Sequence, residues 1–222
     1  MKRYFYTQLS FIVVLIVLSA GAATADDRRD TGELKSYQGV ALGSVNDFRE
    51  NSIGGVRNVN LNRYRLRVDG LVKKPLVFTY RELQTLPRQK KIVTTHCVEG
   101  WTVTVLWEGI PMGEMIRRAE VDKKVNTVIF YGVDGYTTSL AYEAVAGKNM
   151  LLADSANGMP LPAKLGFPFI LVAEDKWGYK WARWIERIEF SDKKNFRGYW
   201  EQRGYNQKGD LSGPIGEDHP SR

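Results

Sequence analysis

The chain has 222 residues with a formal net charge of +7, and 43% of its residues are hydrophobic. This is enough for one domain with a sizeable core. Basic and acidic residues are interspersed, without a basic stripe or a nucleic-acid-binding module, which argues against nucleic acid as a partner. No internal repeat and no Ser/Pro-rich linker divides the chain.

The N-terminus has the pattern of a secretory signal. Lys2 and Arg3 precede an apolar run at 9–18, and the small residues at 23–25 fit a cleavage site. The run is shorter than the about 20 residues of a membrane span, although an uncleaved membrane anchor is the alternative interpretation of this segment. We therefore predict a signal peptide at 1–25, a single domain at 26–222, and a periplasmic or otherwise exported protein.

Residues 26–60 are polar and contain glycines, so we expect mostly irregular structure there. Strict alternation at 63–69 then predicts a strand with Tyr64, Leu66 and Val68 pointing inward. Short runs rich in apolar and β-branched residues predict further strands. These runs lie at 75–78, 91–95, 102–105, 125–131 and 167–173, with another extended or mixed segment at 183–190.

Helix signals are few. Thr79 and Glu82 have the spacing of a capping box and predict a helix that stops before Pro87. Short helices are also predicted at 111–119 and 140–146, and the polar tail from Gln207 is expected to lie loosely on the surface. Many short strands with a few short helices, in no regular alternation, predict an α+β fold.

Cys97 is the only cysteine of the chain. An unpaired thiol in an exported protein needs an explanation. It can be a buried small hydrophobic residue, or a catalytic thiol assisted by histidine. The second interpretation is weak, because adjacent strand residues face opposite ways, so His96 would point away, and His219 lies in the tail.

Two metal-binding interpretations remain. A zinc or iron–sulfur site would need several cysteine and histidine ligands, which this sequence lacks. A single thiolate could instead bind a soft, redox-active metal whose other ligands come from a cofactor. Such ligation would also protect the thiol of Cys97 from oxidation.

The segment HCVEGW at 96–101, followed by WEGIP at 107–111, resembles the cysteine motif of the sulfite oxidase family of molybdopterin-binding oxidoreductases. It is most similar to the bacterial periplasmic branch that includes the methionine sulfoxide reductase catalytic subunit. The resemblance extends over about residues 60–206. Its further motifs lie at 134–140, 158–168, 176–185 and 198–205.

The resemblance implies a sulfite-oxidase-type domain with Mo-molybdopterin as cofactor, and a Cys97 thiolate that completes the sulfur ligands of the metal. It implies Cys97 and Tyr136 as catalytic residues. The implied cofactor-binding residues are Asn46, His96, Cys97, Glu99, Gly178, Lys180, Trp181 and Arg183. The phosphate of the pterin would bind Lys180, Arg183 and backbone N–H groups, with close approach allowed at Gly178.

Each assignment has a plainer alternative. Lys180 and Arg183 can be surface charges, Glu99 a solvated carboxylate, and Tyr136 an ordinary half-buried tyrosine. The chain also departs from the family pattern, because Leu165 and Ile170 stand where relatives usually have polar cofactor contacts. Lys2-Arg3 is not the twin-arginine pair that usually accompanies export of such proteins in folded form.

The resulting functional prediction is an exported molybdenum oxidoreductase that transfers one oxygen atom to or from a small, sulfur-containing substrate. The sequence has no Cys-x-x-Cys-His haem motif, so electrons would pass through a separate cytochrome or membrane haem subunit. The alternative is a metal-free binding module on the same fold, which the apolar residues Leu165 and Ile170 favour and which Cys97 and Glu99 oppose.

Overall fold

The computed structural model describes residues 27–216. One of its sheets is mixed and runs in the order β4-β3-β12-β7-β8. The central strands β3 and β12 are parallel, and the other neighbours are antiparallel. The bounds are β3 (Arg65–Gly70), β4 (Leu76–Thr79), β7 (Thr127–Gly132), β8 (Thr137–Ala141) and β12 (Ile185–Ser191).

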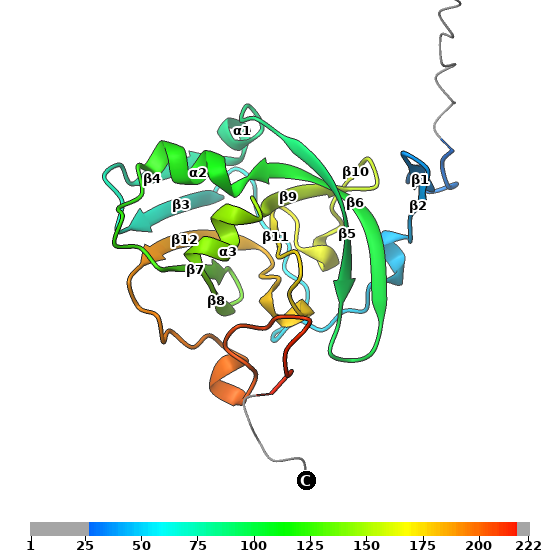
Figure 1. Cartoon of the computed structure of the whole chain (residues 1–222). Coiled ribbons are helices and arrows are strands. Elements are labelled where there is room, and N and C mark those ends of the chain that lie inside the picture. The colour runs from blue at the N-terminus through cyan, green and yellow to red at the C-terminus, as the bar shows by residue number, and fades with distance from the viewer. Residues whose placement is uncertain (1–26, 217–222) are drawn as a thin grey trace, which may run out of the picture.

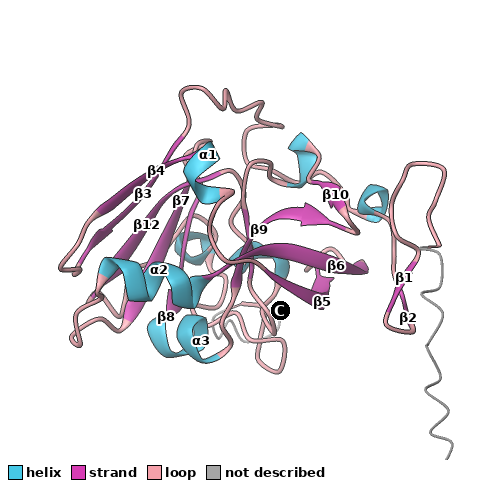
Figure 2. Cartoon of the chain, turned by 90° about the horizontal axis from the view of Figure 1, so that it is seen from above, coloured by secondary structure: helices cyan, strands magenta, loops and turns pink. Residues whose placement is uncertain are grey.

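The other large sheet is antiparallel and runs in the order β10-β9-β6-β5, with β11 also paired to β9. Figure 2 shows the two sheets beside one another, with the long β5–β6 hairpin in the second. The bounds are β5 (Gln89–His96), β6 (Thr102–Pro111), β9 (Leu151–Ala156), β10 (Met159–Pro160) and β11 (Ile170–Val172).

The helices are short and lie between or beside the sheets (Figure 1). They are α1 (Tyr80–Leu83), α2 (Met112–Ala119) and α3 (Tyr142–Gly147). Single 3-10 turns are η1 (Val45–Asp47), η2 (Ala163–Leu165), η3 (Gly178–Lys180) and η4 (Glu201–Arg203). A small hairpin of β1 (Ser36–Tyr37) and β2 (Val40–Ala41) completes the described part of the chain.

Alternation in the sequence does decide which strand faces enter the core. Leu66 and Val68 have no exposed surface and Tyr64 is 4% exposed, as the pattern at 63–69 predicts. The capping box also forms, because the Thr79 side chain accepts the N–H of Glu82 and the Glu82 side chain accepts the N–H of Thr79. The α+β prediction is confirmed.

Three sequence expectations fail. The segment 140–146 is not one helix, because its first two residues belong to β8 and α3 begins at Tyr142. The predicted strand at 167–173 is reduced to β11, and β9 was not predicted. The tail is not loose as far as residue 210, since Gly209 is buried and its carbonyl accepts the N–H of Trp177 at 2.9 Å.

The predicted signal peptide at 1–25 and its alternative as a membrane anchor lie outside the described residues. Between residues 27 and 216, no helix is long and apolar enough to cross a membrane. The single domain at 26–222 stays a prediction.

Candidate functional site

Cys97 lies one residue beyond the end of β5, in the tight loop that leads into β6. The loop closes through two backbone hydrogen bonds, from Gly100 N–H to the Cys97 carbonyl and from Cys97 N–H to the Trp101 carbonyl, both 3.0 Å. Gly100 has φ +84°, a conformation that favours glycine. The VEG sequence after the cysteine therefore turns the hairpin and fixes the direction of the thiol.

The thiol opens onto a cavity of about 150 Å³. Cys97 is itself 4% exposed. Five separate parts of the chain wall the cavity. The lining residues are Asn51, Ser52, Ile53, Cys97, Val98, Glu99, Asp134, Tyr136, Gly178, Tyr179, Trp181, Arg183, Trp184, Trp200 and Tyr205.

Several polar groups act on the sulfur of Cys97. Burial raises the pKa of the Cys97 thiol, and the nearby Glu99 carboxylate acts in the same direction. The Glu99 backbone N–H, the Arg183 charge and the Asn51 amide act in the opposite direction but do not outweigh burial. Asn51 Nδ2 lies 3.6 Å from Cys97 Sγ, in position to donate a hydrogen bond.

Arg183 orients this amide. One guanidinium nitrogen donates to Asn51 Oδ1 at 2.9 Å and another to the Lys164 carbonyl at 3.0 Å. Glu50 lies 3.6 Å from the same guanidinium. Because Oδ1 accepts from Arg183, the Nδ2 group of Asn51 is the one turned to the sulfur.

The remaining walls are mostly aromatic. Trp181 is 5% exposed, and its Nε1 donates to the Lys176 carbonyl at 3.1 Å. Tyr136 lines the cavity, but its hydroxyl donates to the Tyr179 carbonyl, so this proton already has a protein acceptor. Burial raises the pKa of Tyr136 well above its ordinary value, which keeps the hydroxyl protonated.

Gly178 brings η3 against the strand that carries the thiol. A Cβ at this position would lie 3.3 Å from the His96 carbonyl oxygen and 3.6 Å from Cys97 Cα. Gly178 itself lines the cavity, and its predicted close approach to a cofactor phosphate stays a prediction.

The structure gathers Cys97, Glu99, Tyr136, Gly178, Trp181 and Arg183 around the cavity. Three other predicted residues lie elsewhere. His96 is outside the lining, with its ring packed edge-on against Trp177. Asn46 is exposed, and its Oδ1 accepts a hydrogen bond from Lys164 at 3.3 Å.

Lys180 is the third. It is fully buried, and its ammonium is bonded to Glu201 and to the Ser139 carbonyl, so the side chain does not reach the cavity. Sequence reasoning also missed Asn51, which lies beside the sulfur and lines the cavity. The available signal was the ENS segment at 50–52, but an asparagine in a loop has many other uses.

The donor set fits a metal that arrives with its own organic ligands. Between residues 27 and 216, no three His, Cys, Asp or Glu side chains are grouped to hold a metal ion. The cavity does offer one soft sulfur donor, Cys97, together with a cation at Arg183 and a backbone wall at Gly178. Molybdopterin, which brings two sulfur ligands and an anionic phosphate, matches these groups chemically.

Comparison with known proteins agrees. The sequence profile of the family described as "Oxidoreductase molybdopterin binding domain" matches residues 53–200. The chain is 32% identical over 152 residues to the "Uncharacterized oxidoreductase YuiH" of Bacillus subtilis (strain 168), covering 68% of this chain and 76% of that protein. It is 30% identical over 147 residues to the "Protein-methionine-sulfoxide reductase catalytic subunit MsrP" of Ralstonia nicotianae, covering 59% of this chain and 44% of MsrP.

Among solved structures, the sulfane dehydrogenase SoxCD of Paracoccus pantotrophus aligns with a TM-score of 0.61 over 68% of this chain and 42% of that chain. At 24% identity this likeness shows a shared fold alone. The predicted resemblance to the sulfite oxidase-like family near MsrP is confirmed. The chain belongs to the molybdopterin-binding oxidoreductases, whose cofactor is Mo-molybdopterin.

Proposed function

We propose that this protein transfers an oxygen atom to or from a small, sulfur-containing substrate, with the Cys97 thiolate as its ligand to molybdenum. The observation that carries the proposal is the position of Cys97, the only cysteine of the chain. It lies in the wall of a cavity that is also lined by the cationic side chain of Arg183 and by Gly178, which has no side chain to cover its backbone. Membership of the molybdopterin-binding family supports the same assignment.

The bound cofactor would supply two-electron oxygen-atom transfer chemistry. The residues of this chain would bind, orient and shield. Cys97 would offer its sulfur, and the Asn51 N–H directed at that sulfur would tune it, as hydrogen bonds to metal-bound thiolates do. Arg183 would fix Asn51 and attract the anionic part of the cofactor.

The aromatic side chains would exclude water from the site. Trp181, Trp200 and Tyr205 line the cavity. We place Tyr136 in the same group, because its hydroxyl is already bonded to the Tyr179 carbonyl. Its predicted catalytic role would require that bond to open first, and so remains a prediction.

The relatives bear on substrate and partner. MsrP is named as the catalytic subunit of a protein-methionine-sulfoxide reductase, which supports a sulfoxide as substrate and a separate electron-transfer subunit. Sulfite oxidation is the opposite direction of the same atom transfer. We propose a cytochrome or membrane haem subunit as electron partner, and a periplasmic location from the predicted signal peptide at 1–25.

The decisive experiment measures molybdenum per chain in protein made in a molybdopterin-competent host. We expect about one molybdenum per chain, since a single thiol can hold a single cofactor-borne metal. Sulfoxide reduction with a reduced viologen dye and sulfite oxidation with ferricyanide then give the direction. Cys97→Ser should abolish both activities while leaving the fold largely intact.

Thr95→Ser is the matched control. Thr95 is buried in β5, two residues before the cysteine, and does not line the cavity, so its substitution should leave metal content and activity unchanged. An active, metal-replete Cys97→Ser variant would refute the ligation. Well-folded protein without molybdenum would instead favour the metal-free binding module, which the buried apolar residues Leu165 and Ile170 suggest.

A further inference from the structure

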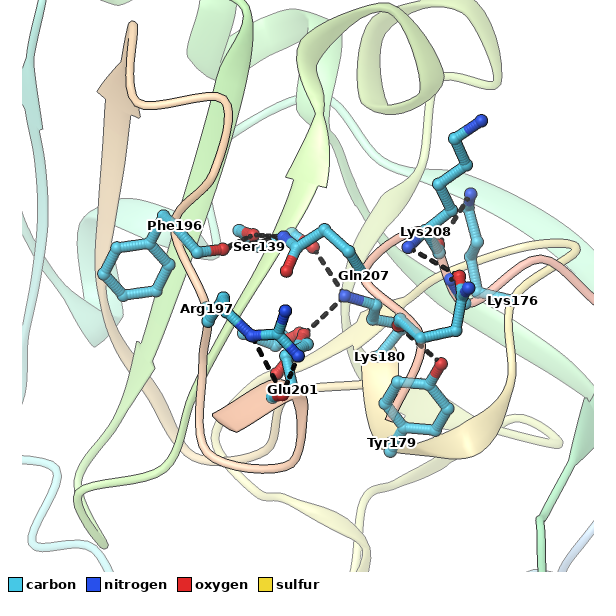
Figure 3. Close-up of polar contacts among 12 residues, drawn as sticks. Ser139, Lys176, Tyr179, Lys180, Phe196, Arg197, Glu201, Gln207 and Lys208 are labelled. Carbon is cyan, nitrogen blue, oxygen red and sulfur yellow. Dashed lines mark hydrogen bonds and ion pairs between the residues drawn. The ribbon is translucent and has the colours of Figure 1, made fainter. Parts of the chain in front are cut away.

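A buried ion pair beside the cavity joins the sequence motif at 176–185 to the motif at 198–205. Lys180 and Glu201 are both fully buried, and Lys180 Nζ is bonded to Glu201 Oε1 and, at 3.0 Å, to the Ser139 carbonyl (Figure 3). Thr138 Oγ1 donates to the same Glu201 oxygen at 2.6 Å. Buried pairs of this kind often add little stability over apolar replacements, so their geometry is the more informative property.

The pair joins three parts of the chain that each contribute to the cavity wall. Lys180 ends η3, Glu201 begins η4, and the two residues that complete the network belong to β8. η3 itself lines the cavity, and a lining residue directly precedes η4 and β8. The lining residues beside the pair are Gly178 and Tyr179 before Lys180, Trp200 before Glu201, and Tyr136 just before β8.

Further bonds hold residues 198–211, here called the C-terminal strap, around the same centre. Gln207 Nε2 donates to Ser139 Oγ at 2.9 Å and to the Phe196 carbonyl at 2.7 Å (Figure 3). The Tyr179 hydroxyl donates to the Asn206 carbonyl at 2.8 Å. The strap also lies directly on the lysine, since a Cβ on Gly209 would be 2.6 Å from Lys180 Cγ.

The strap forms one wall of the cavity with its aromatic rings. Trp200 and Tyr205 both line the cavity, and their ring centroids are 5.1 Å apart. The Tyr205 ring also packs edge-on against Tyr179, with centroids 4.9 Å apart. A shift of the strap would therefore move this wall away from η3 and open the side of the cavity.

The ion pair between Lys180 and Glu201 restricts how the C-terminal strap can move. Glu201 Oε2 is buried without a hydrogen-bond partner, so the carboxylate is held through Oε1 alone. If the strap moved, both charges would lose their main partner inside the protein. Water could reach the two charges only if the whole strap detached from η3. The ion pair therefore favours a single position of the strap, packed against η3.

We propose that Lys180 and Glu201 are positioning residues that clamp the C-terminal strap against the cavity and so retain the cofactor. This rests on the proposed function for the cofactor that is retained, whereas the clamp itself concerns the protein alone. It gives the lysine of the 176–185 motif a role different from the phosphate contact that the sequence suggested.

The test uses Glu201→Gln in the full chain, with Asp154→Asn as a matched control. Asp154 is 2% exposed and paired with the partly exposed Arg88, so the control also removes a buried carboxylate from an ion pair, but at a place that does not line the cavity. Hydrogen–deuterium exchange of the strap is measured on cofactor-free protein. Pterin release from molybdenum-loaded protein is followed by the fluorescence of the free pterin, and melting temperatures are recorded for both variants.

We expect Glu201→Gln to speed amide exchange in the strap and pterin release at least tenfold over Asp154→Asn, even after the variants are compared at equal distance below their melting temperatures. Equal strap exchange in the two variants would overturn the clamp. Because exchange is read without cofactor, a protein that binds no molybdenum would refute the proposed function and leave the clamp to be judged by exchange.

The double variant Lys180→Met with Glu201→Leu covers the case in which Glu201→Gln does not fold. Removal of both charges should restore a folded protein, because neither charge is left buried alone. We expect its strap to exchange faster than in the unaltered chain, since the apolar pair fixes no single alignment. Strap protection equal to that of the unaltered chain would show that packing alone holds the strap, and would refute the clamp.

Discussion

Glu33→Gln tests how the segment before Asn51 is held in place. Glu33 is 2% exposed, and both its oxygens accept hydrogen bonds. Oε2 accepts from Val45 N–H at 2.9 Å and from Asn157 Nδ2 at 3.1 Å. Oε1 accepts from the Ser44 hydroxyl at 3.0 Å. The carboxylate therefore anchors η1, which begins at Val45 and leads towards the cavity wall at Asn51.

Glutamine can keep part of this arrangement. Its oxygen can stay on Val45 N–H and Asn157, while its NH₂ group faces the Ser44 hydroxyl, which can rotate to accept. The two retained bonds lose the charge of their acceptor, and hydrogen bonds to charged groups contribute about 1 kcal/mol more than neutral ones. We expect a loss of about 1–2 kcal/mol at neutral pH, which lowers the melting temperature by about 2–8 °C in a protein of this size.

The pH dependence separates charge from packing. Burial alone would raise the pKa of Glu33, but the hydrogen bonds from Val45, Asn157 and Ser44 together with the Arg29 charge outweigh it, and the pKa is lowered from 4.5. The ionised side chain then stabilises the fold above pH 4.5, and this contribution disappears as the pH falls through the lowered pKa.

The assay is thermal unfolding of both proteins between pH 7 and pH 3, with Glu143→Gln as control. Glu143 is exposed, so its substitution should change stability by less than about 0.5 kcal/mol. The gap between Glu33→Gln and the unaltered chain should narrow below pH 4.5. A gap of constant size down to pH 3 would refute the charge argument, and no gap at pH 7 would refute the anchoring of η1.

Two further substitutions test the cavity. Gly178→Ala would place a methyl group 3.3 Å from the His96 carbonyl oxygen, so η3 must retreat by a few tenths of an ångström. We expect less molybdenum per chain and a loss of only about 1 kcal/mol in stability. Unchanged molybdenum content would contradict a role for the close approach of η3 to His96. Arg183→Lys keeps the charge but loses the planar guanidinium that holds Asn51. We expect the cofactor affinity, measured by equilibrium titration of the apoprotein, to fall about 10–100-fold. Unaltered affinity would show that the charge alone suffices.

Local patterns in the sequence predicted much of the fold because local physics decides it. Leu66 and Val68 form the buried face of β3, and Tyr64, just before the strand, is buried on the same face, as their alternation predicts. The capping box between Thr79 and Glu82 starts α1 at the expected residue. In both cases the signal and the structural cause lie within a few residues of each other.

The prediction errors occur where contacts between segments distant in the sequence determine the local structure. Leu140 and Ala141 were predicted to begin a helix, yet they end β8, because that strand pairs with β7. The tail looked loose because Gln207 and Gly209 are typical loop residues. Their partners lie on β8 and η3, and no local pattern reveals contacts across such sequence separations.

The site shows the same division. Cys97, Glu99, Gly178, Trp181 and Arg183 line one cavity, because a short motif specifies the path of its own backbone, and their role as cofactor contacts stays a prediction. Such a motif does not specify which partner a long side chain finds. Asn46 was expected at the pterin, but Asn51 is the asparagine beside the sulfur, five positions further along an irregular segment without periodicity.

The position of Lys180 changes how the cavity can attract an anion. With that ammonium neutralised by Glu201, Arg183 is the one basic side chain among the cavity-lining residues, opposite the carboxylates of Glu99 and Asp134. Leu165 and Ile170 are buried in the core and add no polar group. Under the proposed function, recognition of an anionic cofactor would depend on Arg183 and on backbone N–H groups near Gly178, with no second cation in the cavity wall.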